Sequence, residues 1–153
     1  MELTQNPSVL ELVQKTAELT TPKEIVWIDG SEAQLESLRK IAVETGELIK
    51  LNEEKLPGCY LNRSDVNDVA RVEGRTFICS RTREEAGPTN NWMDPDEMKA
   101  KLHEILRCAM AGRTMYVIPY SMGVIGSPFA KYGIEVTDSI YVVLNMAIMT
   151  RVG

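Results

Sequence analysis

Two arginines and a glutamate alternate with small or apolar residues in the segment 69–75, which reads Val-Ala-Arg-Val-Glu-Gly-Arg. A planar guanidinium such as that of Arg71 can bind a carboxylate through two parallel hydrogen bonds, which a lysine cannot reproduce. An arginine close to a strand is, however, more often a solvated or salt-bridged surface group. The residues alone therefore leave two interpretations of Arg71 open, a carboxylate-binding group and an ordinary surface cation.

The glycine-rich run Gly123-Val-Ile-Gly-Ser-Pro suggests an anion-binding loop, because such turns can direct backbone N–H groups at a phosphate. The nucleotide-binding pattern Gly-x-x-x-x-Gly-Lys-Ser/Thr occurs nowhere in the chain. We therefore favour a structural loop between two strands for residues 123–128, and we assign no ligand to it.

Other reactive side chains lack the partners that catalysis requires. His103 is the only histidine, and Arg107 stands where a His-Glu-x-x-His zinc motif needs its second histidine. Ser121 has no histidine partner within a recognisable nucleophile motif, so covalent catalysis is not supported. The sequence therefore predicts no catalytic residue and no metal ligand within this chain.

Composition narrows the class of protein. The chain has 153 residues and a net charge of −5, which argues against a general binder of nucleic acids or anionic membranes. Cys59, Cys79 and Cys108 are odd in number and widely spaced, which favours three reduced thiols. No basic-then-apolar start and no membrane-spanning apolar segment is present. We therefore expect a cytoplasmic protein with no membrane partner.

The first half of the chain predicts alternating helices and strands. Asn6 and Pro7 are typical of a helix start, and Thr20, Thr21 and Pro22 end that helix. Residues 24–30 predict a strand and a tight turn, after which Ser31 caps a second helix. Its predicted core face comprises Leu35, Leu38, Ile41 and Ala42. Short strands are predicted at 48–51, 59–61 and 76–79, a helix at 65–70 and a long polar loop at 80–92.

The second half predicts a central strand between two helices. Asp94 and Pro95 begin a helix that Gly112 ends, with a buried face at Met98, Leu102, Ile105, Leu106 and Ala109. Residues 114–118 predict a strand buried on both faces, and 134–137 a half-exposed strand. Asp138 or Ser139 caps a last helix whose buried stripe is Val142, Met146, Met149 and Val152, with Gly153 at its C-cap. We expect one domain over 1–153 of class α/β, with a mixed β-sheet and packed helices.

Several runs also resemble a known family. These are Asp68-Val-Ala-Arg-Val-Glu, Met115-Tyr-Val-Ile-Pro-Tyr-Ser-Met-Gly, Gly126-Ser-Pro and Gly133-Ile-Glu-Val-Thr-Asp-Ser. Together they resemble the N-terminal lobe of GTP-dependent phosphoenolpyruvate carboxykinase. The resemblance is dense from about Asp68 to the end of the chain.

The resemblance implies roles for two residues. Arg71 would hold the carboxylate of oxaloacetate or phosphoenolpyruvate, and Glu73 would help to set up the closed active site. The full-length enzyme converts oxaloacetate and GTP to phosphoenolpyruvate, GDP and CO2 in gluconeogenesis, with Mn2+ and Mg2+ as cofactors. The family's kinase loop, manganese ligands and guanine pocket lie downstream of the matched region.

We therefore expect an N-terminal piece of the enzyme that binds no cofactor and is inactive alone. Unpaired sheet edges and an apolar last helix predict that it self-associates. The alternative is a stand-alone, non-catalytic module that binds small carboxylates or assembles with itself.

Overall fold

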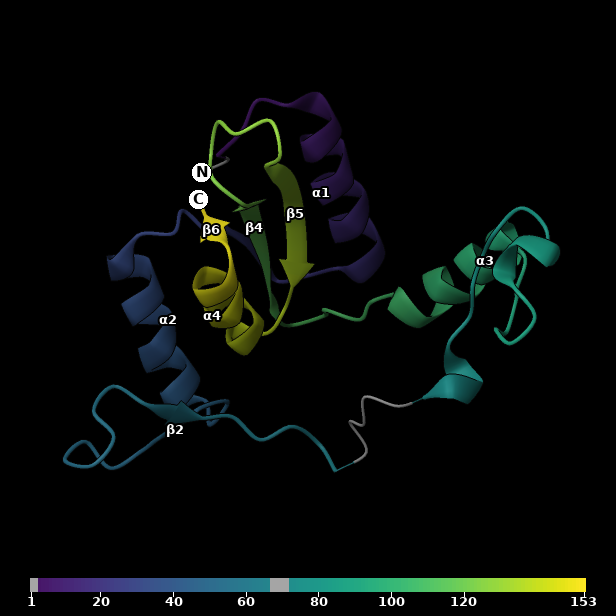
Figure 1. Cartoon of the computed structure of the whole chain (residues 1–153). Helices are drawn as coiled ribbons and strands as arrows, with labels where there is room; N and C mark the ends of the chain where they lie inside the picture. The colour runs from purple at the N-terminus through teal and green to yellow at the C-terminus, as the bar shows by residue number, and fades with distance from the viewer. Residues whose placement is uncertain (1–2, 67–71) are drawn as a thin grey trace.

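The computed structural model describes residues 3–66 and 72–153 of the chain. It confirms the α/β class, because the described residues form α-helices packed on a mixed sheet (Figure 1). The elements are α1 Pro7–Thr20, β1 Glu24–Trp27, α2 Glu32–Glu44, β2 Ile49–Lys50, β3 Tyr60–Leu61, η1 Glu73–Arg75, η2 Glu84–Ala86, α3 Pro95–Leu106, β4 Thr114–Met122, β5 Lys131–Thr137, α4 Ile140–Met149 and β6 Arg151–Val152.

Strand β4 lies at the centre of the main sheet. It pairs with β1 in parallel, with β5 antiparallel on its other edge, and with the short antiparallel β6 near its end. The strand continues through Pro119 to Met122, four residues beyond the predicted end at Ile118. Ile28 donates its N–H to the Val117 carbonyl at 2.9 Å, and the next rung would need an N–H from residue 119. Pro119 has none, so the parallel ladder with β1 ends there.

Alternation along β4 supplies both hydrophobic cores. Met115 and Val117 face α1 and pack with Val13 and Trp27. Tyr116 and Ile118 face the other way, where they meet residues of α2 and α4: Leu35, Leu38, Ala42, Ile140 and Val143. The prediction that this strand is buried on both faces is therefore confirmed.

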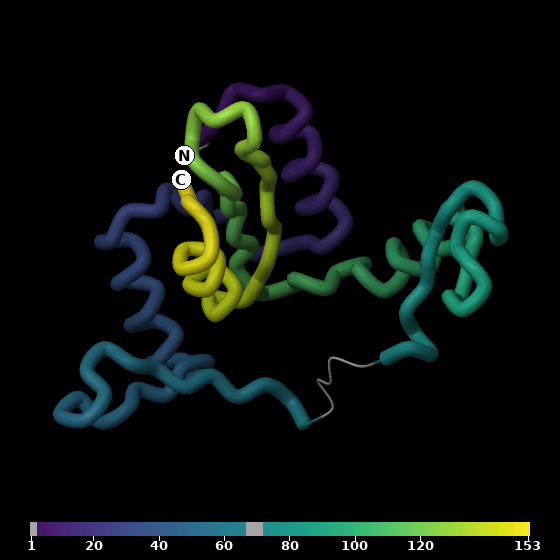
Figure 2. Tube along the Cα trace, viewed as in Figure 1, coloured from purple at the N-terminus to yellow at the C-terminus, as the bar shows by residue number. Residues whose placement is uncertain are grey.

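Helix α3 departs from its prediction. Asp94 caps it as expected, accepting from Asp96 N at 2.9 Å and Glu97 N at 3.2 Å. The helix ends at Leu106 rather than near Gly112, and none of its residues is buried; Ile105 is 73% exposed. Figure 2 shows α3 and the segment before it standing away from the sheet. An apolar stripe marks one face of a helix, but it does not determine what covers that face.

Smaller predictions also need correction. Residues 76–79 form no strand, since only a single parallel bridge joins Ile78 to Trp92. Ile41 is exposed on α2, and Met149 is 68% exposed on α4, whose buried residues are Ile140 and Val143. Val152 lies in β6 instead of the helix. Gly153 is no C-cap; it donates its N–H to Pro119 O at 3.0 Å. Most of the predicted 65–70 helix falls outside the described residues.

Candidate functional site

Arg71 lies outside the described residues. The described part of the candidate site begins with the segment that follows Arg71. Val72 leads into the short helix η1, where Arg75 N donates to Val72 O at 2.8 Å. The Thr76 hydroxyl donates to the same Val72 carbonyl at 3.0 Å. These bonds make residues 72–76 a tight turn that begins one residue after Arg71.

Asn91 ties this turn to a segment that is distant in sequence. Its Nδ2 donates to Glu73 O at 2.8 Å and to Thr76 O at 3.2 Å. Next to it, Ile78 N donates to Asn91 O at 2.8 Å. The Asn91 side-chain amide therefore joins the two ends of η1. The Asn91 backbone carbonyl also accepts the hydrogen bond from Ile78.

Hydrogen bonds also order the long polar stretch 80–92, which was predicted as a loop. Trp92 Nε1 donates to Ser80 O at 3.1 Å, and Asn90 Nδ2 donates to Ala86 O at 2.7 Å. Ala86, in η2, is buried. The stretch is therefore folded, and its two asparagines have different partners: Asn90 bonds within the stretch, and Asn91 bonds to Glu73 and Thr76 at η1.

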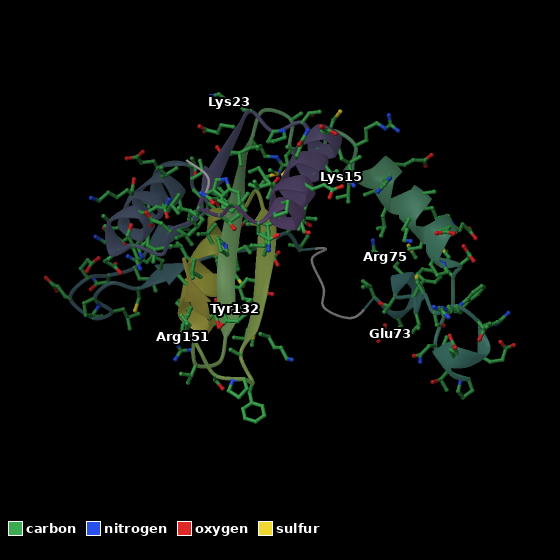
Figure 3. All side chains as sticks on the ribbon, turned by 90° about the horizontal axis from the view of Figure 1, so that it is seen from above. Lys15, Lys23, Glu73, Arg75, Tyr132 and Arg151 are labelled. Atoms are coloured by element: carbon green, nitrogen blue, oxygen red, sulfur yellow. The ribbon has the colours of Figure 1, made fainter. Side chains whose placement is uncertain are left out.

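Glu73 projects from η1 into solvent. Its side chain is exposed and forms no ion pair with any described residue. Figure 3 labels Glu73 and Arg75 on η1, well separated from Tyr132 and Arg151 on the β4–β5 side of the molecule. Among the described residues, no cation pairs with this carboxylate, and it faces solvent.

Several backbone donors of the loop at 123–130 are used in bonds within the loop or to the neighbouring strand β5. Ser127 N bonds to Val124 O at 3.0 Å and Ala130 N to Ser127 O at 3.1 Å. Gly126 N donates to the Tyr132 hydroxyl at 3.3 Å, and Arg151 Nη1 donates to Gly123 O at 3.1 Å. These contacts support a structural loop, because the N–H groups of Gly126, Ser127 and Ala130 already have protein acceptors and are not directed at an anion.

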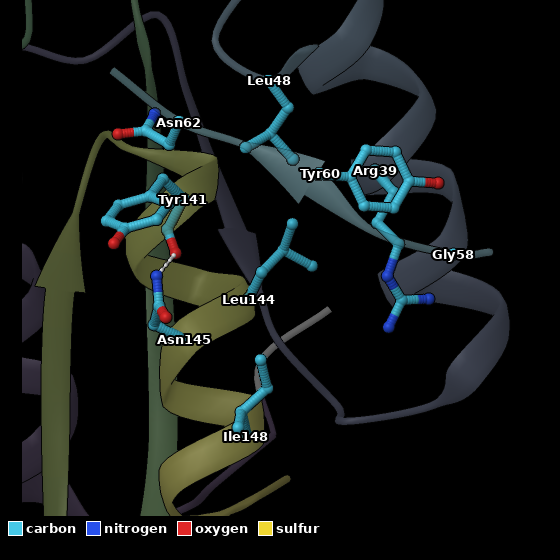
Figure 4. Close-up of a pocket in the computed structure, with 9 residues that line it drawn as sticks. All are labelled: Arg39, Leu48, Gly58, Tyr60, Asn62, Tyr141, Leu144, Asn145 and Ile148. Carbon is cyan, nitrogen blue, oxygen red and sulfur yellow. Dashed lines mark hydrogen bonds between the residues drawn. The ribbon is translucent and has the colours of Figure 1, made fainter. Parts of the chain in front are cut away.

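A pocket of about 280 Å³ lies between α2, α4 and the β2–β3 pair (Figure 4). Leu48, Leu144 and Ile148 give it an apolar wall, and Asn145 Nδ2 donates to Tyr141 O at 2.9 Å. Arg39 lies at its margin, where hydrogen bonding to Glu32 raises the pKa of the guanidinium above its ordinary value. Arg39 forms ion pairs with both Glu32 and Glu36, so the described lining of the pocket offers a carboxylate no unpaired cation.

The described histidine, cysteine and acidic side chains form no cluster that could bind a metal ion. Within the described ranges, no three His, Cys, Asp or Glu side chains come together as a metal site would require. Cys59, Cys79 and Cys108 are free thiols, as predicted. Among the described helices, none has the length and apolar character needed to cross a bilayer.

Two features escaped prediction. Glu47 accepts a hydrogen bond from the Ser139 hydroxyl at 2.6 Å, across 92 positions of sequence. Ser121 is 3% exposed, and its hydroxyl has no hydrogen-bond partner among the described residues. No local pattern signals either feature, because each depends on what the fold places beside it.

Comparison with known proteins places these features in a family. The family model described as the phosphoenolpyruvate carboxykinase N-terminal domain matches residues 11–153. The protein named phosphoenolpyruvate carboxykinase [GTP] from Corynebacterium kroppenstedtii is 56% identical over 98% of this chain, and that from Neocallimastix frontalis is 54% identical over 97%.

The homologue of the same name from Anaeromyxobacter dehalogenans is 54% identical over 98% of the chain. This chain spans 24% of the length of the Corynebacterium kroppenstedtii and Neocallimastix frontalis relatives and 25% of the Anaeromyxobacter dehalogenans one. The chain belongs to the phosphoenolpyruvate carboxykinase N-terminal domain family.

Proposed function

We propose that this chain is the N-terminal part of an enzyme that converts oxaloacetate and GTP to phosphoenolpyruvate, GDP and CO2. The supporting observation is the family match over residues 11–153, which includes the run Asp68-Val-Ala-Arg-Val-Glu. We place the parent enzyme in gluconeogenesis and in the cytoplasm. We further propose that residues 1–153 form a single domain within its N-terminal lobe.

In this proposal Arg71 positions the substrate. Its guanidinium binds a carboxylate of oxaloacetate or phosphoenolpyruvate through two charge-assisted hydrogen bonds and neither donates nor accepts a proton. Glu73, two residues on, supports the closed site. Asn91 fixes the turn that follows Arg71, through its bonds to Glu73 O and Thr76 O.

GTP and the divalent metals Mn2+ and Mg2+ act, in this proposal, through parts of the enzyme beyond this chain. No described cluster of His, Cys, Asp and Glu fits a metal. The residues of this chain therefore contribute substrate binding and orientation, and the phosphoryl transfer is completed elsewhere.

The test replaces Arg71 with lysine or alanine in the full-length enzyme. Each charge-assisted hydrogen bond contributes on the order of 1.5–3 kcal/mol. Losing two should lower kcat/KM for oxaloacetate roughly 10²–10⁴-fold, at about 1.4 kcal/mol per decade. Arg71→Lys should resemble Arg71→Ala, because lysine keeps the positive charge but cannot form two parallel hydrogen bonds to a carboxylate. GTP binding and the melting temperature should stay close to wild type.

Arg75→Lys is the matched control, since it changes an arginine of the same stretch that we do not place on the substrate. It should leave kcat/KM unchanged. Wild-type kcat/KM in Arg71→Lys, or a collapsed melting curve, would show that Arg71 is structural and that the site is wrongly placed.

The isolated chain provides a second test. We expect the 153 residues alone to show no carboxykinase activity and no measurable affinity for GTP. Calorimetry with GTP and Mn2+ measures this, and micromolar binding would contradict it. Calorimetry with oxaloacetate separates out the alternative of a stand-alone carboxylate-binding module, which predicts saturable binding without GTP.

A further inference from the structure

Hydrogen bonds hold the backbone on both sides of Glu73, which Figure 3 labels on η1. Val72 O lies in the peptide group before the Glu73 Cα. It accepts from Arg75 N at 2.8 Å and from the Thr76 hydroxyl at 3.0 Å. Glu73 O, in the peptide group after that Cα, accepts from Thr76 N at 3.2 Å and from Asn91 Nδ2 at 2.8 Å. Each carbonyl therefore has two donors, as many as its two lone pairs accept.

Thr76 supplies one donor to each of these two carbonyls. Its hydroxyl bonds to Val72 O, and its N–H bonds to Glu73 O. Its own carbonyl accepts from Asn91 Nδ2 at 3.2 Å. The backbone at Glu73 can change only by rotation of φ and ψ, which turns the two flanking peptide groups. Holding both groups therefore fixes the direction in which the Glu73 side chain leaves the backbone.

The residue type at position 76 suits this role. Thr76 follows η1 with φ −101° and ψ 124°, an extended conformation that β-branched residues favour. The branch at Cβ also restricts χ1, so the hydroxyl loses little rotamer freedom when it bonds to Val72 O. Valine would keep this shape without a donor, and serine would keep the donor without the branch.

We propose that Thr76 is a positioning residue for Glu73, an inference that rests on the proposed function, in which Glu73 supports the closed site. No ion pair with a described residue restrains the Glu73 carboxylate, so the turn at residues 72–76 determines where the side chain starts. A turn that is already fixed lowers the conformational entropy lost when the closed site forms.

Steady-state kinetics of the full-length enzyme test the hydroxyl. Thr76→Val should lower kcat/KM for oxaloacetate roughly three- to tenfold, the effect of losing one neutral hydrogen bond. Thr76→Ser should restore kcat/KM to near wild type, because it keeps the donor. Melting temperatures of both variants should stay close to wild type, which checks the fold. Wild-type kcat/KM in Thr76→Val, or equal losses in Thr76→Val and Thr76→Ser, would overturn the inference.

Thr45 provides the matched control, at the end of α2. Its exposed hydroxyl donates to Ile41 O at 3.0 Å, again to a carbonyl four residues back. Thr45→Val therefore removes the same kind of bond from a part of the chain that we do not place at the site. It should leave kcat/KM unchanged. A loss as large as that of Thr76→Val would show that any such bond affects activity through general stability.

A double-mutant cycle shows whether Thr76 acts through Glu73. In the Glu73→Ala enzyme, Thr76→Val should lower kcat/KM no further, because the carboxylate that the turn positions is absent. A full additional loss in that background would overturn the inference.

The same variants separate this inference from the proposed function. If Arg71→Lys and Glu73→Ala are impaired while Thr76→Val matches wild type, only the role of Thr76 fails. If Glu73→Ala has wild-type kinetics, the proposed support of the closed site fails, and the role of Thr76 fails with it. Wild-type kinetics in Arg71→Lys alone count against the proposed substrate contact, whereas the role of Thr76 is decided by its own cycle with Glu73.

Discussion

Glu47 and Ser139 form a 2.6 Å hydrogen bond between the end of one helix and the start of another. The carboxylate lies three residues after α2, and the same Oε1 accepts from Tyr141 N at 2.8 Å, in the first turn of α4. Ser139 Oγ accepts from Val142 N at 3.4 Å. Two donors that a helix start leaves unpaired are therefore satisfied, Tyr141 N by the Glu47 carboxylate and Val142 N by the Ser139 hydroxyl. The carboxylate also places a negative charge where the helix dipole favours one.

Replacing Glu47 with alanine should destabilise the fold. Hydrogen bonds to a charged group contribute about 1.5–3 kcal/mol, so Glu47→Ala should lower the free energy of unfolding by roughly 2 kcal/mol. Urea denaturation measures the change. Glu54→Ala, which removes an exposed carboxylate outside any ion pair of the described chain, is the control and should be near neutral.

Coupling between the two residues is a separate measurement. In a double-mutant cycle, Glu47→Ala and Ser139→Ala should together cost less than the sum of the single changes, since they remove one shared bond. Strict additivity would mean that the contact contributes nothing to stability.

Gly30 is a position where the fold requires glycine. Its φ is 72°, and a Cβ built there would clash with the Val152 carbonyl oxygen of β6. Gly46 has a φ of 80° but open space around it. Both alanine variants therefore carry backbone strain of about 1 kcal/mol, and only Gly30→Ala should also disturb β6. Thermal melts should show a clearly larger loss for Gly30→Ala; equal losses would contradict the close approach.

Stability at alkaline pH should depend on Tyr116. This side chain is 7% exposed, and burial raises the pKa of its phenol above the ordinary value. A raised folded-state pKa gives stability that is complete below the unfolded pKa of about 10 and is lost as pH rises toward the folded pKa. Urea midpoints of wild type should therefore fall more steeply than those of Tyr116→Phe above about pH 10. Parallel pH profiles would show that the phenol titrates normally.

Sequence patterns predicted those parts of the fold that local chemistry decides. The caps at Asn6, Ser31 and Asp94 each accept the expected backbone hydrogen bond, because a cap and its partners are neighbours in sequence. Strand β4 was recognisable from its β-branched and aromatic residues. The extension through Pro119 was not, since the consequence of a missing N–H depends on which neighbouring strand it faces.

The remaining features of the fold and the site depend on contacts between residues distant in sequence, and these could not be predicted. Helix α3 has the predicted apolar stripe. The sequence of residues 95–106 does not show whether other elements cover that stripe, and the described fold leaves it exposed. Glu47 was invisible as a cap because its partner lies 92 positions away. The candidate site at Arg71 and Glu73 rests on family resemblance, and the roles of both residues stay predictions. Asn91, which ties the turn at Glu73, was missed because its role requires two distant carbonyls to meet its amide.

Asn91 gives the last prediction, in the full-length enzyme and resting on the proposed function. Its Nδ2 joins Glu73 O and Thr76 O, and so fixes the turn that follows Arg71. Each bond contributes about 0.5–1.5 kcal/mol, so Asn91→Ala should raise KM for oxaloacetate roughly tenfold, with a smaller effect on kcat. Asn91→Asp should be equally impaired, because a carboxylate matches the amide in shape but has no N–H to donate.

Asn90 is the matched control, because its amide bonds to Ala86 O at 2.7 Å and does not reach η1. Asn90→Ala should lower the melting temperature and leave KM for oxaloacetate near wild type. GTP kinetics should be unchanged in all three variants. If Asn91→Asp keeps a wild-type KM, the donor bonds to η1 do not position the substrate arginine. If Asn90→Ala raises KM as much as Asn91→Ala, the effect reflects general loosening of residues 80–92 rather than the turn itself.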